Sequence, residues 1–228
     1  MTALLDVIDL GRRDYLDTLA LQRDLRLARL DGREPRDLLL LVEHEPVYTL
    51  GRGTRASSLP LPVAALEARG ATVAEVERGG DVTWHGPGQL VGYPILDLRQ
   101  HREDLHWYLR QLERALIGAL VELGLEATPD PGRTGVWTGG RKIASIGIHV
   151  KQWVTLHGFA LNVAPDLAWF DAIVPCGISG VEMTSVAREL GGDQATWWQP
   201  TRDDVGAAFG AAFALAPAAR DGATSGAA

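Results

Sequence analysis

The sequence predicts one α/β (α+β) domain, in which a mixed sheet is flanked by helices. Two segments, 15–29 and 104–123, place apolar residues at helical spacing with charged residues between them. The apolar run 37–42 has the length of a buried strand. The glycine pair Gly139-Gly140 joins two strand-like runs and predicts a β-hairpin. These patterns share one chain in which 46% of the residues are hydrophobic, enough for a sizeable core.

The remaining elements follow from the same spacing rules and from turn residues. In chain order we expect helix 15–29, strand 37–42, helix 62–69 with proline in its first turn, strands 71–77 and 90–98, helix 104–123, a hairpin of 135–138 and 142–150, strand 153–163 and helix 201–215. Asp104 is a suitable N-cap and Gly124 a suitable C-terminal stop. The catalytic domain is predicted to span 1–215. The Ala/Gly/Ser-rich tail 216–228 has little to bury and is predicted to be disordered.

Composition excludes several classes of function. The net charge of -7 argues against general nucleic-acid binding. No segment approaches the 20 or so apolar residues of a membrane span, and the N-terminus lacks the features of a signal peptide. A single cysteine fits a reducing compartment. We therefore expect a cytoplasmic protein with no membrane association.

Cys176 is the only cysteine, so the chain has no internal disulfide. It is either a buried, inert side chain or a nucleophile. The small residues around it, in PCGISG, would let another molecule approach the thiol closely. A reactive thiolate needs a positive neighbour or nearby amides. Lys142 could supply the charge, and the amides of Gly177 and Ile178 could supply oxyanion donors. The loop alone leaves both interpretations open.

Lysine is rare in this chain: of 22 basic residues only Lys142 and Lys151 are lysines. Arginine does not deprotonate in proteins, whereas a desolvated lysine can, so a lysine kept here is a candidate for proton transfer. If 142–150 is a strand, Lys142 shares a face with Ala144, Ile146 and Ile148 and is partly desolvated. Alternatively, it is a strand-end lysine whose amine reaches water.

Two further segments interrupt strand-like runs with glycine and histidine. Residues 78–89 hold four glycines around Trp84 and His85, a backbone that a ligand can approach closely. Their spacing fits neither a dinucleotide-binding nor a Walker motif, and an ordinary turn-rich connection is the alternative. In 155–163, His157 is interpreted as an ordinary hydrogen-bonded histidine. His85, His149, His157 and Cys176 lack close ligand spacing, so no metal site is predicted.

Four segments in order resemble the lipoyl(octanoyl)transferase family, and the resemblance covers about 38–186. They are RGGDVTWHGPGQLVGYPILDL, GRKIASIGIHV, TLHGFALNV and PCGISGVEMTSV. The resemblance implies a biotin/lipoyl protein ligase-like catalytic domain. It also implies transfer of an octanoyl group from octanoyl-acyl carrier protein to a specific lysine of lipoyl domains, in the first step of endogenous protein lipoylation. The implied acceptors are 2-oxoacid dehydrogenase subunits and the glycine cleavage H protein.

The matching positions imply roles for individual residues. Cys176 would be the acyl-thioester nucleophile, and Lys142 the partner that favours its thiolate. The substrate-binding residues would be Arg78, Gly79, Gly80, Asp81, Val82, Thr83, Trp84, His85, Ser145, Ile146, Gly147, Gly158, Phe159 and Ala160. Apolar residues near Gly147 and Phe159 could line an acyl tunnel. Because a thioester donor is already activated, no cofactor is expected, neither ATP nor a metal.

Carrier proteins and lipoyl domains are typically acidic, as this chain is, so we expect a local basic docking face formed by Arg52, Arg55, Arg78 and Arg141. Three alternatives remain. An ATP-dependent lipoate- or biotin-protein ligase would need ATP and no thiol. A Cys-His hydrolase, with His85, His149 or His157 as the base, would use water as the acyl acceptor. A non-catalytic carrier-binding module would form no covalent adduct.

Overall fold

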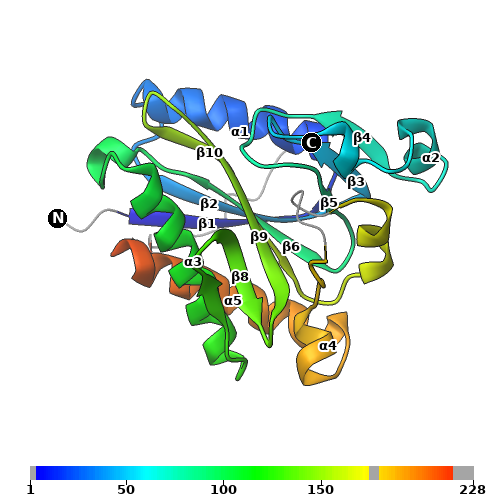
Figure 1. Cartoon of the computed structure of the whole chain (residues 1–228). Coiled ribbons are helices and arrows are strands. Elements are labelled where there is room, and N and C mark those ends of the chain that lie inside the picture. Colours follow the sequence, from blue (N-terminus) through cyan, green and yellow to red (C-terminus); the bar gives the residue numbers. More distant parts are fainter. Residues whose placement is uncertain (1–3, 175–179, 218–228) are drawn as a thin grey trace, which may run out of the picture.

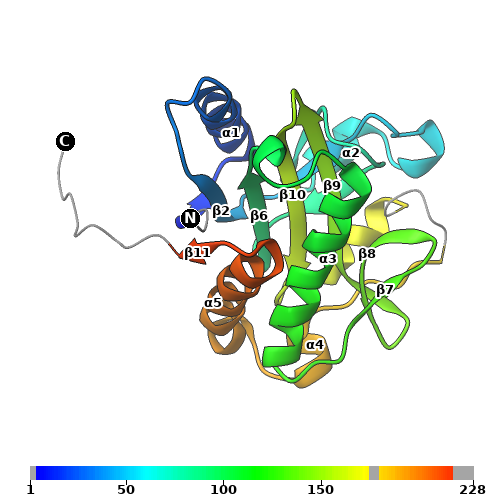
Figure 2. The ribbon, with the colours of Figure 1, turned by 90° about the vertical axis from the view of Figure 1, so that its left-hand side faces the viewer.

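The computed structural model describes residues 4–174 and 180–217. Within them, eight strands form the main sheet in the order β11-β1-β2-β6-β10-β9-β8-β7 (Figures 1 and 2). These strands are β1 (Leu4–Arg13), β2 (Asp37–His44), β6 (Gln89–Ile95), β7 (Thr128–Asp130), β8 (Arg133–Thr138), β9 (Arg141–Lys151), β10 (Val154–Asn162) and β11 (Ala216–Pro217). The strand β1 runs parallel to β2 and β11, and the other neighbours are antiparallel. The predicted mixed sheet is confirmed.

A smaller sheet stands beside the main one. It consists of β3 (Val47–Leu50), β4 (Thr72–Glu75) and β5 (Thr83–His85), with β3 in the centre. The short helix α2 (Val63–Glu67) leads into β4, and η1 (Ala56–Ser58) and η3 (Leu167–Ala172) are 3₁₀ turns. This sheet carries the glycine-rich segment that begins at Arg78, because β5 lies within it.

Helices cover both faces of the main sheet. Figure 1 shows α1 (Tyr15–Leu30) on one side and α3 (Leu105–Glu122) and α5 (Gln194–Phe213) on the other. Figure 2 shows α3 and α5 side by side across the sheet. The short helices η2 (Leu98–Gln100) and α4 (Val186–Leu190) complete the described elements. Alternate residues of β2 point to the two faces, which explains why all five residues of 38–42 are apolar.

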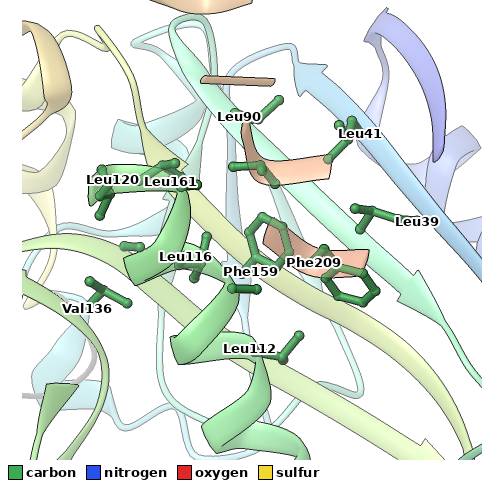
Figure 3. Close-up of a cluster of buried hydrophobic side chains, with 14 of the residues drawn as sticks. Leu39, Leu41, Leu90, Leu112, Leu116, Leu120, Val136, Phe159, Leu161 and Phe209 are labelled. Carbon is green, nitrogen blue, oxygen red and sulfur yellow. The ribbon is translucent and has the colours of Figure 1, made fainter. Parts of the chain in front are cut away.

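The larger core lies between the sheet and the pair α3 and α5. Leu112, Leu116 and Leu120 follow one face of α3 and are fully buried. They belong to the same cluster as Phe159 of β10 and Phe209 of α5 (Figure 3). The apolar face at i, i+4 and i+8 is therefore the feature of the sequence that places α3 on this sheet.

The capping residues behave as expected at α3. The Asp104 side chain accepts a hydrogen bond from the Trp107 amide at 3.0 Å, and Gly124 after the helix has a φ of 85°. The last helix differs from its prediction, since it starts at Gln194 and includes Pro200. Asp193 caps it by accepting from the Thr196 amide at 2.9 Å.

One edge of the main sheet, formed by β11 and β1, departs from the sequence prediction. Strand β1 was not predicted, because most of its residues are exposed and show no apolar alternation. Ala216 and Pro217, assigned to the tail, pair with Leu4 and Leu5 of β1. The rest of the predicted tail, 218–228, lies outside the described residues, as does Cys176.

Candidate active site

A cavity of about 390 Å³ lies beside β9 and β10, within the range of small-molecule sites. Thirteen of the fourteen predicted substrate-binding residues line it. These are Arg78, Gly79, Gly80, Asp81, Val82, Thr83, His85, Ser145, Ile146, Gly147, Gly158, Phe159 and Ala160. Three segments that are far apart in the sequence thus meet around one space. Their roles in binding remain a prediction.

Trp84 is the predicted residue that does not line this cavity. It is fully buried between β5 and η3, and its ring stacks on Trp169 with a centroid distance of 5.6 Å. Phe170 packs against it edge-on. Strand alternation explains the difference, since Thr83 and His85 face the cavity and Trp84 faces away from it.

Arg78 holds the glycine-rich segment in place. Its Nη2 donates to the Thr49 carbonyl at 2.6 Å, and its Nη1 donates to the Asp81 carbonyl at 2.7 Å. The Asp81 carboxylate accepts from Ser58 Oγ at 2.6 Å and from the Val82 amide at 2.7 Å. These bonds fix the curve of the backbone around the cavity.

Two glycines allow this backbone to approach β9. The Gly79 amide donates to the Ile148 carbonyl at 2.8 Å, and Gly80 has a φ of 87°. A Cβ on Gly147 would lie 3.1 Å from both Arg78 Cδ and the Gly79 carbonyl oxygen. A side chain at 147 would crowd the space between the loop and the strand.

His85 is a neutral hydrogen-bonding group of the cavity wall. Its Nδ1 lies 2.7 Å from Gln89 Oε1, and the Gln89 amide donates to Asn162 Oδ1 at 2.9 Å. Burial, with a smaller effect of His44, lowers the pKa of His85 from 6.5 to about 3. At neutral pH it therefore adds no charge to the cavity.

Lys142 lies in the wall of the same cavity and is only 2% exposed. Its Nζ is 5.6 Å from the centroid of the Trp137 ring, within the range of a cation–π contact. The side chain passes over Gly135, where a Cβ would come within 2.8 Å of Lys142 Cε. The alternative that this amine reaches open water is wrong.

The main chain of Lys142 is held on both sides. Its amide donates to the Glu182 carbonyl at 2.8 Å, and its carbonyl accepts from the Thr184 amide at 2.9 Å. The segment that follows Cys176 in the sequence thus runs beside Lys142. Cys176 itself falls outside the described residues, so the contact between the two remains a prediction.

His157 departs from its interpretation as an ordinary hydrogen-bonded histidine. It lines the cavity, is 1% exposed, and has a φ of 59°. Its Nε2 lies 3.5 Å from Glu77 Oε2, longer than a normal hydrogen bond. Within the described residues neither ring nitrogen has a hydrogen-bond partner. Burial lowers the pKa of His157, and the nearby Glu77 carboxylate partly offsets this effect.

Sequence reasoning did not predict several lining residues. They are Tyr15, Val91, Tyr93, Leu109, Gly132, Arg133, Thr134 and Ile148. Tyr15 comes from the first turn of α1, and Leu109 from α3, on opposite sides of the sheet. Tyr15, Val91, Tyr93 and Leu109 look like core positions of their own elements, whereas Gly132, Arg133 and Thr134 belong to a partly exposed turn and the start of β8. For Ile148, the strand face that it shares with Lys142 was a usable signal.

The predicted basic docking face is only partly correct. Arg52 and Arg55 are exposed, as such a face requires. Arg78 is 6% exposed and bonded to the backbone, so it cannot contact a partner. Arg141 forms an ion pair with Glu189 at 2.7 Å and stays partly exposed. The prediction for Arg78 was wrong because its guanidinium is used inside the protein, where it donates hydrogen bonds to the backbone carbonyls of Thr49 and Asp81.

The chain is similar in sequence to known proteins of one enzyme family. Residues 14–214 match the family model described as lipoyl protein ligase A/B catalytic domain. An octanoyltransferase of Gloeobacter violaceus is 53% identical over 173 residues, 76% of this chain and 76% of the relative. An octanoyltransferase of Geobacter sulfurreducens is 52% identical over 185 residues, 81% of this chain and 75% of the relative.

A solved structure supports the fold. The bipartite lipoate protein ligase from Thermoplasma acidophilum superposes with a TM-score of 0.68 at 16% identity, covering 96% of this chain and 88% of the other. The predicted ligase-like fold is confirmed. No helix in residues 4–174 and 180–217 combines the length and apolarity needed to cross a membrane.

Proposed function

Because the chain belongs to the lipoyl protein ligase A/B catalytic domain family, with octanoyltransferases about 50% identical over most of its length, we propose that it transfers an octanoyl group from octanoyl-acyl carrier protein to a specific lysine of lipoyl domains. The acceptors are lipoyl domains of 2-oxoacid dehydrogenase subunits and the glycine cleavage H protein. The observation that carries the proposal is a buried lysine in the wall of a cavity formed by the glycine-rich loop and β9.

The first half of the reaction forms an acyl-enzyme. Lys142, as a neutral amine, accepts the proton of the Cys176 thiol, and the thiolate attacks the thioester carbonyl carbon. A new C–S bond forms and the C–S bond to the carrier breaks. The departing carrier thiolate takes its proton from the Lys142 ammonium. Burial beside Trp137 supports this role, because it shields the amine from water.

The second half passes the acyl group to nitrogen. The amine of the acceptor lysine attacks the enzyme thioester, the C–N bond forms, and the Cys176 thiolate leaves. The proton lost by the acceptor amine goes to Lys142 and then to the thiolate. The thioester supplies the activation, so the reaction as proposed needs neither ATP nor a metal. A cytoplasmic location fits a single reduced cysteine.

The choice of donor tests the proposal against the ligase alternative. We expect octanoyl-carrier protein to octanoylate a lipoyl domain without ATP, and free octanoate with ATP to give no product. Transfer that requires ATP would contradict the proposal. Release of free octanoate in place of transfer would favour a hydrolase, and carrier binding without either product would favour a binding module.

The two lysines of the chain give a matched pair for the role of Lys142. Lys142→Arg keeps a positive charge and loses the ability to accept a proton, so transfer should fall at least 100-fold, on the order of a general acid–base contribution. Lys151→Arg is the control, because Lys151 is exposed at the end of β9. Single-turnover transfer rates measure both. Equal rates for the two variants would remove Lys142 from the mechanism.

A further inference from the structure

The register of the sheet shows how far the cavity extends. Lys142 is at the start of β9, and His157 of β10 pairs with Ile148, six residues farther along. At about 3.3 Å per residue the two positions are roughly 20 Å apart along the strand. Both residues line the same cavity. It therefore runs lengthwise along β9, with the proposed chemistry near one end.

Buried rings line the part of the cavity near His157. Tyr15 and Tyr93 line it and are nearly completely buried. The Tyr15 ring stacks on His85 at a centroid distance of 5.9 Å and an interplanar angle of 7°. His157 completes this wall. These lining side chains are buried and packed, so they have little freedom to move away from a ligand.

His157 is the polar member of this wall and is held rigidly. Its amide donates to Gln22 Oε1 of α1 at 3.0 Å. Its left-handed backbone conformation is one that few non-glycine residues adopt. Its ring nitrogens have no hydrogen-bond partners among the described residues. The nearest carboxylate oxygen given for the ring is Glu77 Oε2, 3.5 Å from Nε2. A methylene pushed against the His157 ring would contact its buried polar nitrogen atoms.

We propose that His157, together with Tyr15, is the end wall that sets the longest acyl chain this enzyme accepts. The inference rests on the proposed octanoyl transfer. A distance of about 20 Å leaves room for the Lys142 side chain, the reacting thioester and one extended octanoyl chain of roughly 9 Å. A longer chain would have to displace the His157 ring. His157 is thus a specificity-determining residue and takes no part in proton transfer.

The test compares the rates at which donors with acyl chains of different length react with a variant whose residue 157 has no side chain. His157→Gly removes the ring and suits the positive φ. Each buried methylene is worth about a fourfold gain in binding, so two additional methylenes should raise the decanoyl-to-octanoyl rate ratio on the order of tenfold. The hexanoyl-to-octanoyl ratio should stay unchanged. Rates of acyl transfer from six-, eight-, ten- and twelve-carbon carrier thioesters measure this.

Control variants keep the outcome interpretable. His149→Ala changes a histidine of the neighbouring strand that does not line the cavity, and it should leave every ratio unchanged. His157→Asn tolerates the left-handed backbone and shortens the side chain, so it carries the test if the glycine variant does not fold. An unchanged decanoyl ratio in a folded variant that still transfers octanoate would overturn the inference alone. A wild-type enzyme that transfers no octanoyl group would overturn the proposed function instead.

Discussion

Gly135 provides the space that the Lys142 side chain occupies. Its φ of 136° is unfavourable for other residues, and a Cβ there would lie 2.8 Å from Lys142 Cε and 2.7 Å from the Ala144 carbonyl oxygen. This glycine is part of the site although it is 41 positions from the predicted nucleophile. The sequence shows it only as the first residue of a hairpin strand.

Gly135→Ala should therefore slow octanoyl transfer by at least about tenfold, because even a small displacement of a reacting group has a large effect on rate. Gly140→Ala is the matched control. Gly140 also has a positive φ, of 80°, in the same hairpin, and a Cβ there would meet nothing within 4 Å. Both variants should lose about 1–2 kcal/mol of stability from the backbone alone. Wild-type transfer by Gly135→Ala would show that the Lys142 position does not depend on this contact.

Arg29, Asp37 and His101 connect the end of α1, the start of β2 and η2. Asp37 accepts from Arg29 Nη2 at 2.9 Å, and its other oxygen lies 2.6 Å from His101 Nε2. Arg29 and Asp37 are 3% and 1% exposed. The ion pair between Arg29 and Asp37 fixes α1 over the sheet, and α1 brings Tyr15 to the cavity. A stable packing of this helix is thus a condition for the shape of the site.

Asp37→Asn leaves the Arg29 charge buried without its carboxylate, so the free energy of unfolding should fall by about 3–5 kcal/mol. Asp31→Asn removes the partner of Arg33 in an exposed pair at 3.3 Å and should change it by less than about 1 kcal/mol. Urea unfolding of both variants makes the comparison. Equal, small changes would mean that the buried pair contributes nothing beyond an exposed one.

Elements with strong periodicity and caps were predictable, and α3 with Asp104 and Gly124 is the clearest case. Strand β1, which lies between β2 and the two-residue edge strand β11, was not predictable, because an exposed strand needs no apolar alternation. The residues of the site likewise fall into those that the sequence predicted and those that it did not. Glycine-rich segments identified most of the cavity wall, whereas Tyr15 obtained its position from tertiary packing that no local pattern encodes.

Buried histidines, among them His44 and His85, make the stability of the whole molecule depend on pH. Burial lowers the pKa of His44 from 6.5 to about 4 and, with a smaller effect of His44, that of His85 from 6.5 to about 3. The unfolded chain binds these protons below pH 6.5, whereas the folded chain does not until the pH reaches the lowered values. The stability that the neutral rings contribute is therefore complete above pH 6.5 and is lost as the pH falls toward 4.

Between pH 6 and 5 each histidine should reduce the free energy of unfolding by about 1.4 kcal/mol per pH unit. His85→Gln should remove about one proton from the difference in proton binding between the unfolded and folded states, and so lower the slope by about 1.4 kcal/mol per pH unit. Urea unfolding across this range measures the slopes. A slope that His85→Gln does not alter would contradict the assignment of His85 as a buried neutral group.

The central claim is that Cys176 carries the octanoyl group as a thioester, and intact-mass analysis after mixing with octanoyl-carrier protein tests it most directly. In the absence of acceptor, the wild-type chain should gain one octanoyl group, and Cys176→Ala should gain none. Hydroxylamine should remove the adduct, as expected for a thioester. An octanoyl adduct that persists in Cys176→Ala, or a wild-type chain that transfers the group without ever forming an adduct, would contradict the account.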